Sequence, residues 1–156
     1  MFTVILRSVL HNVFVLAVGL AWAYLGTRVD ALTGVHEFSS LPVKVVAIVL
    51  LVLGFLTRLW ATAHFYSHHM RVISLDPQGT LITSGPFQYS RNPLYLGGNV
   101  FTFFGASLLL GSPAALVMTV LHLPLVDLMI RREERQLESR FGAEWRSYRA
   151  RVRRWI

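Results

Sequence analysis

The first segment whose residues could do chemistry is SGPFQYSRNPLYLGG, from Ser84 to Gly98. Asn92 is a good N-cap and Pro93 suits the first helical position, so we expect a helix to begin there. The N–H groups and positive dipole end of that helix would stabilise an anion such as a carboxylate. The alternative is an ordinary capped helix whose neighbouring aromatics, Phe87 and Tyr95, belong to an interface belt.

The second such segment is MIRREERQLESRFG, which contains the adjacent carboxylates Glu133 and Glu134. Neighbouring helical residues lie about 100° apart, so the two cannot face one pocket equally. One of them turned inward would give a pocket an anionic wall. The alternative is a solvated helix with ion pairs four residues apart, such as Asp127 with Arg131.

Composition places these segments in a membrane protein. Of the 156 residues, 54% are hydrophobic and 15% are charged, and the mean hydropathy is +0.52. There is no cysteine, which excludes disulfides and cysteine-based metal or redox sites. The net charge is +7, and nine of the fifteen Lys and Arg residues lie within 131–154. A basic tail on an apolar body favours anionic lipid headgroups over nucleic acid as its partner.

An all-α fold with about four transmembrane helices is therefore expected, as one domain over residues 1–156. A helix needs about 20 apolar residues to cross the hydrocarbon core. The uncharged run of thirty-five residues after Arg91 is too long for one crossing. Gly111 and Pro113 predict a tight hairpin that divides it, because Gly ends helices and Pro begins them. The expected spans are residues 8–27, 42–66, 93–110 and 113–130.

Four spans place both termini on the same side of the membrane. Positive charge gathers in Arg7, Arg71, Arg91 and the tail, so the positive-inside rule predicts that this side is cytoplasmic. The loop 67–92 and the cap 131–156 are then cytoplasmic too. Within the loop we expect a turn at residues 76–79, a short extended TLITS stretch and a turn at residues 85–86.

The tail carries an apolar stripe at helical spacing, with arginines between its members. The stripe consists of Leu137, Phe141, Trp145, Tyr148 and Val152. Such a helix lies in the membrane interface or against the cytoplasmic face of its own protein. Gly142 is expected to break it into two pieces.

Together, GTLITSGPFQYSRNPLYLGG and EERQLESRFGAEWRSYRARVRRW resemble the isoprenylcysteine carboxyl methyltransferases and the related phospholipid methyltransferases. The shared pattern is G-x-[FY]-x-x-x-R-[HN]-P-x-Y-x-G followed by E-E-x-x-L-x-x-x-F-G-x-x-[WY]-x-x-Y. Every fixed position is occupied here, over about half the chain, residues 79–154. The resemblance implies an integral-membrane enzyme that uses S-adenosylmethionine (SAM) and releases S-adenosylhomocysteine (SAH).

The same resemblance implies which residues form the site. The expected cofactor-binding residues are Thr80, Leu81, Ile82, Phe87, Asn92, Pro93, Leu94, Tyr95, Glu133 and Glu134. The expected catalytic residues are Arg91 and Glu133. Many relatives carry an arginine four residues before the first Glu, where it meets a carboxylate on the substrate. Here that position is Met129, so Arg131 and Arg132 are the candidates to replace it.

The resemblance implies methyl transfer to a lipid-like or lipid-anchored acceptor that enters from the bilayer, such as a carboxylate. A carboxylate is ionised at neutral pH and needs no base, whereas an amine nucleophile must first lose a proton. The alternatives are phospholipid amine N-methylation, a membrane reductase of the sterol-reductase type, and a small non-catalytic helical membrane protein. The oligomeric state is left open.

Several polar residues within or beside the spans lie outside these motifs. His64 and His68 are four residues apart, a spacing that can bind metal on a helix, but no third ligand is evident, so no metal site is predicted. Ionisable groups inside a membrane mark functional hypotheses, and His122 is one. We also expect Arg58 to pair with Asp127, because both lie near the cytoplasmic end.

Overall fold

The computed structural model describes residues 2–68 and 79–156, and within them the protein is helical without strands. Its elements are α1 (Phe2–Thr33), α2 (Leu41–Ser67), the 3₁₀ turn η1 (Gly85–Gln88), α3 (Pro93–Tyr95), the π-helix η2 (Leu96–Thr102), α4 (Phe103–Leu110) and α5 (Pro113–Arg151). In this part of the chain, four helices are long and apolar enough to span a membrane. The predicted fold class is confirmed.

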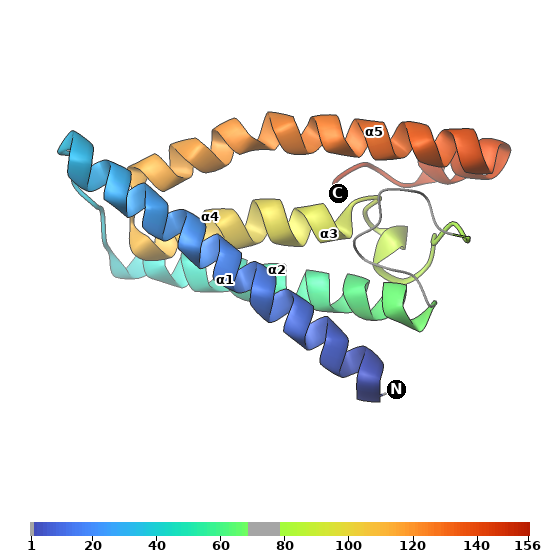
Figure 1. Ribbon diagram of the computed structural model, residues 1–156, viewed down its shortest axis with the longest axis horizontal. Helices are drawn as coiled ribbons and strands as arrows, with labels where there is room; N and C mark the ends of the chain where they lie inside the picture. Colours follow the sequence, from blue (N-terminus) through green and yellow to red (C-terminus); the bar gives the residue numbers. More distant parts are fainter. Residues whose placement is uncertain (1, 69–78) are drawn as a thin grey trace.

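The helices lie roughly along one axis (Figure 1). The third span, made of α3, η2 and α4, lies between α2 and α5, and α1 crosses the bundle obliquely. Helix α1 is longer than the predicted span 8–27, whereas α2 and the third span match 42–66 and 93–110 closely. The bundle therefore surrounds the third span, whose first turn follows the loop that carries the signature.

Helix α5 differs most from expectation because it does not end at residue 130. Its part before the kink at Gly142, residues 113–141, is about 43 Å long at 1.5 Å per residue, whereas the hydrocarbon core is about 30 Å thick. The helix is therefore longer than one crossing needs, and the predicted span 113–130 leaves the rest of it to project beyond the core. Gly142, with φ +49° and ψ −113°, interrupts this projecting part, as predicted. The chain then folds back toward the bundle (Figure 1).

The returning segment packs on the protein itself. Trp145 and Tyr148 are 2% and 3% exposed and form one apolar cluster with Ile82 and Phe87. The Tyr148 hydroxyl also donates to the Phe87 carbonyl at 2.8 Å. The apolar stripe was expected either in the membrane interface or against the protein itself, and in the structure it packs against the protein. The predicted turn at 76–79 falls almost wholly outside the described residues.

A close backbone contact sets the depth of the third span against α2. A Cβ atom on Gly97 would lie 2.8 Å from the Gly54 carbonyl oxygen, and one on Gly54 would lie 2.7 Å from the Gly97 oxygen. Small residues allow such approaches between membrane helices. The contact lies at the start of η2, and π-helical segments occur frequently at functional sites. The Gly54–Gly97 contact therefore sets the position of Leu94 and Tyr95, just before it in the chain, along the axis of α2.

The hairpin between α4 and α5 is joined to the end of α1 by Asp30. Gly111 ends α4 with φ +65°, and Ser112 and Pro113 begin α5, as predicted. The buried Asp30 carboxylate accepts hydrogen bonds from the Ser112 hydroxyl and, at 2.9 Å, from the Ala114 N–H. A carboxylate there also suits the positive dipole end of α5.

We therefore expect Asp30→Ala to lower the free energy of unfolding by about 1–3 kcal/mol, because a buried hydroxyl and an N–H lose their acceptor. Thermal unfolding in detergent measures the change. Glu37→Ala, which removes an exposed carboxylate from the following loop, is the control and should change stability little. Equal midpoints for the two variants would contradict the role given to Asp30.

Candidate active site

A cavity lies where the 79–95 segment, α2 and the projecting part of α5 meet. All ten residues expected to bind a cofactor line it, and so does Arg91. Sequence reasoning did not assign four further lining residues to the site: Phe65, Leu137, Trp145 and Tyr148. Three of these four belong to the stripe or signature of the tail, so the signal was present, whereas nothing in the sequence marked Phe65. Cofactor binding by these residues stays a prediction.

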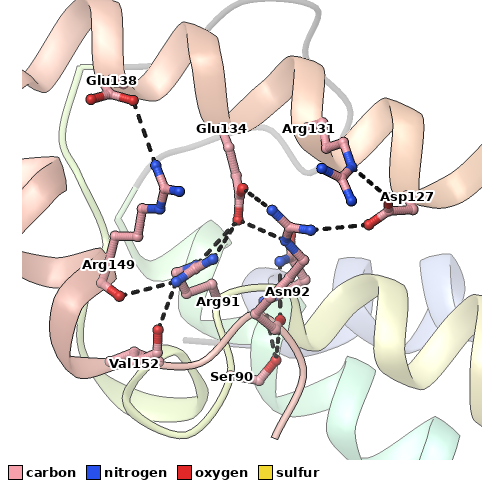
Figure 2. A network of polar contacts seen from close by, with 10 residues as sticks. Ser90, Arg91, Asn92, Asp127, Arg131, Glu134, Glu138, Arg149 and Val152 are labelled. Atoms are coloured by element: carbon pink, nitrogen blue, oxygen red, sulfur yellow. Dashed lines mark hydrogen bonds and ion pairs between the residues drawn. The ribbon is translucent and has the colours of Figure 1, made fainter.

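Glu134 is the centre of a polar network on one wall of the cavity (Figure 2). Its Oε1 accepts from Arg91 Nη2 at 2.8 Å and its Oε2 accepts from Arg154 Nη2 at 2.7 Å. Both Glu134 and Arg91 have side chains 9% exposed. Burial raises the pKa of the Glu134 carboxyl, but hydrogen bonds from Arg154 and Arg91 outweigh it and hold that pKa below its ordinary value. Glu134 is therefore a paired carboxylate.

Arg91 also joins the loop to the C-terminal segment. Its N–H donates to the Arg153 carbonyl at 2.9 Å, and its Nη1 donates to the Val152 carbonyl at 2.8 Å. Asn92 contributes through its side-chain amide, which donates to the Arg154 carbonyl at 3.1 Å. The predicted cap is thus wrong in one respect. Asn92 does precede the helix, but its side chain makes no cap hydrogen bond, because it is bonded to the tail instead.

Glu133 has a different environment from its neighbour, as the helical geometry predicts. Its Oε1 accepts from the Tyr95 hydroxyl at 2.5 Å, and in the described chain no arginine lies within salt-bridge distance of it. Burial raises the pKa of the Glu133 carboxyl, while the hydrogen bond from Tyr95 opposes the rise. Tyr95 and Glu133 come from the two separate signature segments. Their contact therefore joins those segments across the cavity.

Aromatic side chains form another part of the lining. Phe65 and Phe87 have ring centroids 5.3 Å apart, and Trp145 and Tyr148 have centroids 5.6 Å apart. The Arg91 guanidinium lies 5.9 Å from the centre of the Trp145 ring. Within the described chain, the buried indole N–H of Trp145 has no acceptor. A buried donor without a partner is unusual and calls for an explanation.

The residues proposed to replace the missing substrate arginine do not reach this cavity. Met129 is 55% exposed on the outer side of α5. Arg131 pairs with Asp127 at 2.6 Å on the surface, and Arg132 is exposed. The expected pair of Arg58 with Asp127 is also wrong, because Asp127 bonds to Arg131 and Arg154.

The histidines at the end of α2 make local contacts. The His64 Nε2 lies 2.8 Å from the Ser84 hydroxyl, and His68 Nδ1 lies 2.8 Å from the His64 carbonyl. Within residues 2–68 and 79–156, no group of three His, Cys, Asp or Glu residues is placed to hold a metal ion. His122, inside the span, lies 3.0 Å from the Asn99 side-chain oxygen and thus links α5 to η2.

Comparison with known proteins gives a match to a protein family. The family model described as phospholipid methyltransferase matches residues 43–144. That range contains α2 from its third residue, the signature loop, the third span and α5 as far as the residue before Trp145. No curated protein and no solved structure matches.

The Glu134 network predicts a large difference between two glutamates of α5. Glu134→Gln should lower the free energy of unfolding by about 1–3 kcal/mol, since two arginines lose a mostly buried partner and solvent compensates only in part. Glu138→Gln is the matched control. Its carboxylate is 40% exposed and lies 3.7–3.9 Å from Arg146 and Arg149, so its loss should cost less than about 0.5 kcal/mol.

Thermal unfolding and hydrogen exchange of residues 143–151 measure this difference. Faster exchange in Glu134→Gln than in Glu138→Gln is expected, because the returning segment would lose its tie to the loop. Similar exchange in both variants would show that Glu134 does not hold the cavity wall together.

Proposed function

We propose that this chain, which belongs to the phospholipid methyltransferase family, transfers a methyl group from SAM to a lipid-like acceptor. The observation that carries the proposal is the contact of Tyr95 with Glu133 at 2.5 Å. It joins two signature segments that the apolar hairpin separates in the sequence. Family membership supports a membrane methyltransferase, and this contact supports the 79–95 segment and α5 as the two walls of its active site.

The residues in the cavity fit the chemistry of SAM. Its sulfonium and adenine suit aromatic faces such as Phe87 and Trp145, and its ammonium and ribose hydroxyls suit a carboxylate without a cationic partner, which describes Glu133. The free N–H of Trp145 suits an acceptor atom on such a ligand. When bound, SAM supplies a methyl group on an already activated carbon.

The two glutamates then have separate tasks. Glu133 contacts the cofactor together with Tyr95, whereas Glu134 is occupied by Arg91 and Arg154. We accordingly assign Arg91 a positioning role, since its guanidinium bonds to Glu134 and to tail carbonyls. The chain mainly orients the reactants and excludes water, which can lower a barrier by about 7–11 kcal/mol at best.

The acceptor is lipophilic and enters from the bilayer, and a carboxylate is our first candidate because it needs no base. The second candidate is a phospholipid amine, in line with the family's description. One observation favours it: burial raises the pKa of the Glu133 carboxyl in the cavity, which makes Glu133 a better proton acceptor. Transfer from labelled SAM into lipid carboxylates or lipid amines distinguishes the candidates.

The active site faces the cytoplasm in this proposal. The returning tail and the loop at the same end carry most of the arginines, and the positive-inside rule assigns such segments to the cytoplasmic side. Both termini, the loop 67–92 and the cap 131–156 share that side. Protease protection in oriented vesicles tests the assignment.

The cofactor assignment predicts that Glu133→Gln and Tyr95→Phe each weaken SAH binding about tenfold, because each removes a polar contact worth about 1.4 kcal/mol. Calorimetry with purified protein measures the affinity. Tyr89→Phe is the control, since Tyr89 is 68% exposed and does not line the cavity. NADPH is included as the ligand that a reductase would bind.

Two results would count against the proposal in different ways. If the unmodified protein bound neither SAM nor SAH, the function would be wrong. If it bound SAH and both cavity variants bound it equally well, only the mapping of residues would be wrong. Binding of NADPH alone would favour the reductase.

Trp145 gives a prediction that separates ligand binding from packing. Trp145→Phe removes the unpartnered N–H and part of a buried ring, so the free energy of unfolding should fall by about 1–2 kcal/mol, and SAH should bind about fivefold more weakly through loss of about 1 kcal/mol. Trp60→Phe, at a 50% exposed position on α2, should change neither. Equal SAH affinity in the two variants would exclude a ligand bond to the Trp145 N–H.

A further inference from the structure

Arg58 is a buried cation without an acidic partner. It lies within α2 and is 8% exposed. Its Nε donates to the Asn12 oxygen at 3.1 Å, its Nη1 donates to the Leu94 carbonyl at 2.6 Å, and its Nη2 lies 3.0 Å from His11 Nε2. All three partners are neutral acceptors, and no carboxylate in the described chain lies within 4.0 Å of it.

The charge of this cluster is therefore uncompensated. Arginine only donates hydrogen bonds, so the His11 Nε2 must accept and the His11 ring is neutral. A guanidinium has five N–H groups, and these three contacts leave two for another acceptor. Ionisable groups at such depth are costly and normally pair with a counter-charge or line a polar path. The cluster thus has both the charge and the donors to bind an anion.

The fold makes room for the guanidinium beside the cavity. A Cβ atom on Gly98 would lie 2.7 Å from Arg58 Nη1, and one on Gly97 would lie 2.7 Å from Arg58 Cγ. Leu94, whose carbonyl accepts from Arg58, lines the cavity together with Tyr95. His11 is only half-buried, so the cluster is open on the side of α1.

The other cations near the cavity already have carboxylate partners in the described chain. Arg91 and Arg154 share Glu134, and Arg154 also pairs with Asp127. The position where relatives carry a substrate-binding arginine is Met129, which points away from the cavity. An anionic acceptor therefore meets its counter-charge on α2 more readily than on α5.

We propose that Arg58, with His11 beside it, binds the anionic group of a lipid acceptor, a headgroup phosphate or carboxylate, next to the cavity. The proposal rests on the proposed function and narrows its substrate class to anionic lipids. The acyl chains would remain in the bilayer alongside α1, whose outward side chains are largely apolar and exposed. Arg58 then determines which lipids reach Tyr95 and Glu133.

A matched pair at position 11 tests this charge requirement. His11→Gln keeps a neutral acceptor for Arg58 Nη2, whereas His11→Glu supplies an internal carboxylate of nearly the same size. Native mass spectrometry of the detergent-solubilised protein would compare binding of phosphatidic acid, oleate, zwitterionic phosphatidylcholine and inorganic phosphate. We expect the unmodified protein and His11→Gln to retain phosphatidic acid or oleate, and His11→Glu and Arg58→Gln to lose at least tenfold in affinity.

Each other outcome would overturn the proposal. Equal binding of phosphatidic acid by His11→Glu and His11→Gln would mean that the free charge of Arg58 is not used. Equal retention of phosphatidylcholine, or binding of inorganic phosphate as tight as that of the lipids, would mean that no anionic lipid is selected.

SAH calorimetry is run in parallel. Unchanged SAH binding in His11→Glu separates this site from the cofactor site, and SAH binding lost together with lipid binding would make Arg58 a support for Leu94.

Discussion

The carboxylate of Glu134 holds together the segments that enclose the cavity. It lies on the projecting part of α5 and accepts from Arg91 in the loop and from Arg154 in the returning tail. Each of these segments is short, and neither has a core of its own. Their position depends on charged hydrogen bonds to one buried oxygen pair, which are stronger than neutral ones. The positions of the aromatic lining residues depend on this network too, because the tail carries Trp145 and Tyr148 and the loop carries Phe87.

The thickness of the bilayer explains why the carboxylates sit where they do. The helical run of α5 before Gly142 exceeds the hydrocarbon core. Its composition changes near residue 131, from a stretch with Asp127 as its one charged residue to a stretch rich in arginine and glutamate. The first inward-facing positions beyond the core are those of Glu133 and Glu134. There the dielectric is low enough to strengthen hydrogen bonds, yet the ends of the arginines still reach water. A polar cofactor and an apolar acceptor can both reach that level.

The sequence was sufficient for features governed by local pattern. Run lengths without charge predicted the spans, Gly111 and Pro113 predicted the hairpin, and the apolar stripe of the tail predicted a helix broken at Gly142. The fold class and the family followed from these runs and the two motifs. The resemblance carried by the two motifs indicated ten cofactor residues, and all ten line one cavity.

Features that depend on contacts distant in the sequence were not predictable. Asn92 was expected to cap a helix locally, but its side chain bonds to Arg154, sixty-two residues later. Arg58 was expected to find a carboxylate, since buried charges usually pair, yet its partners are Asn12, His11 and a carbonyl. A single sequence gives no signal for such choices. The two errors share a cause, because Asp127 and Asn92 are both bonded to the returning tail. Arg58 is thus left without an acidic partner among the residues that the structure describes.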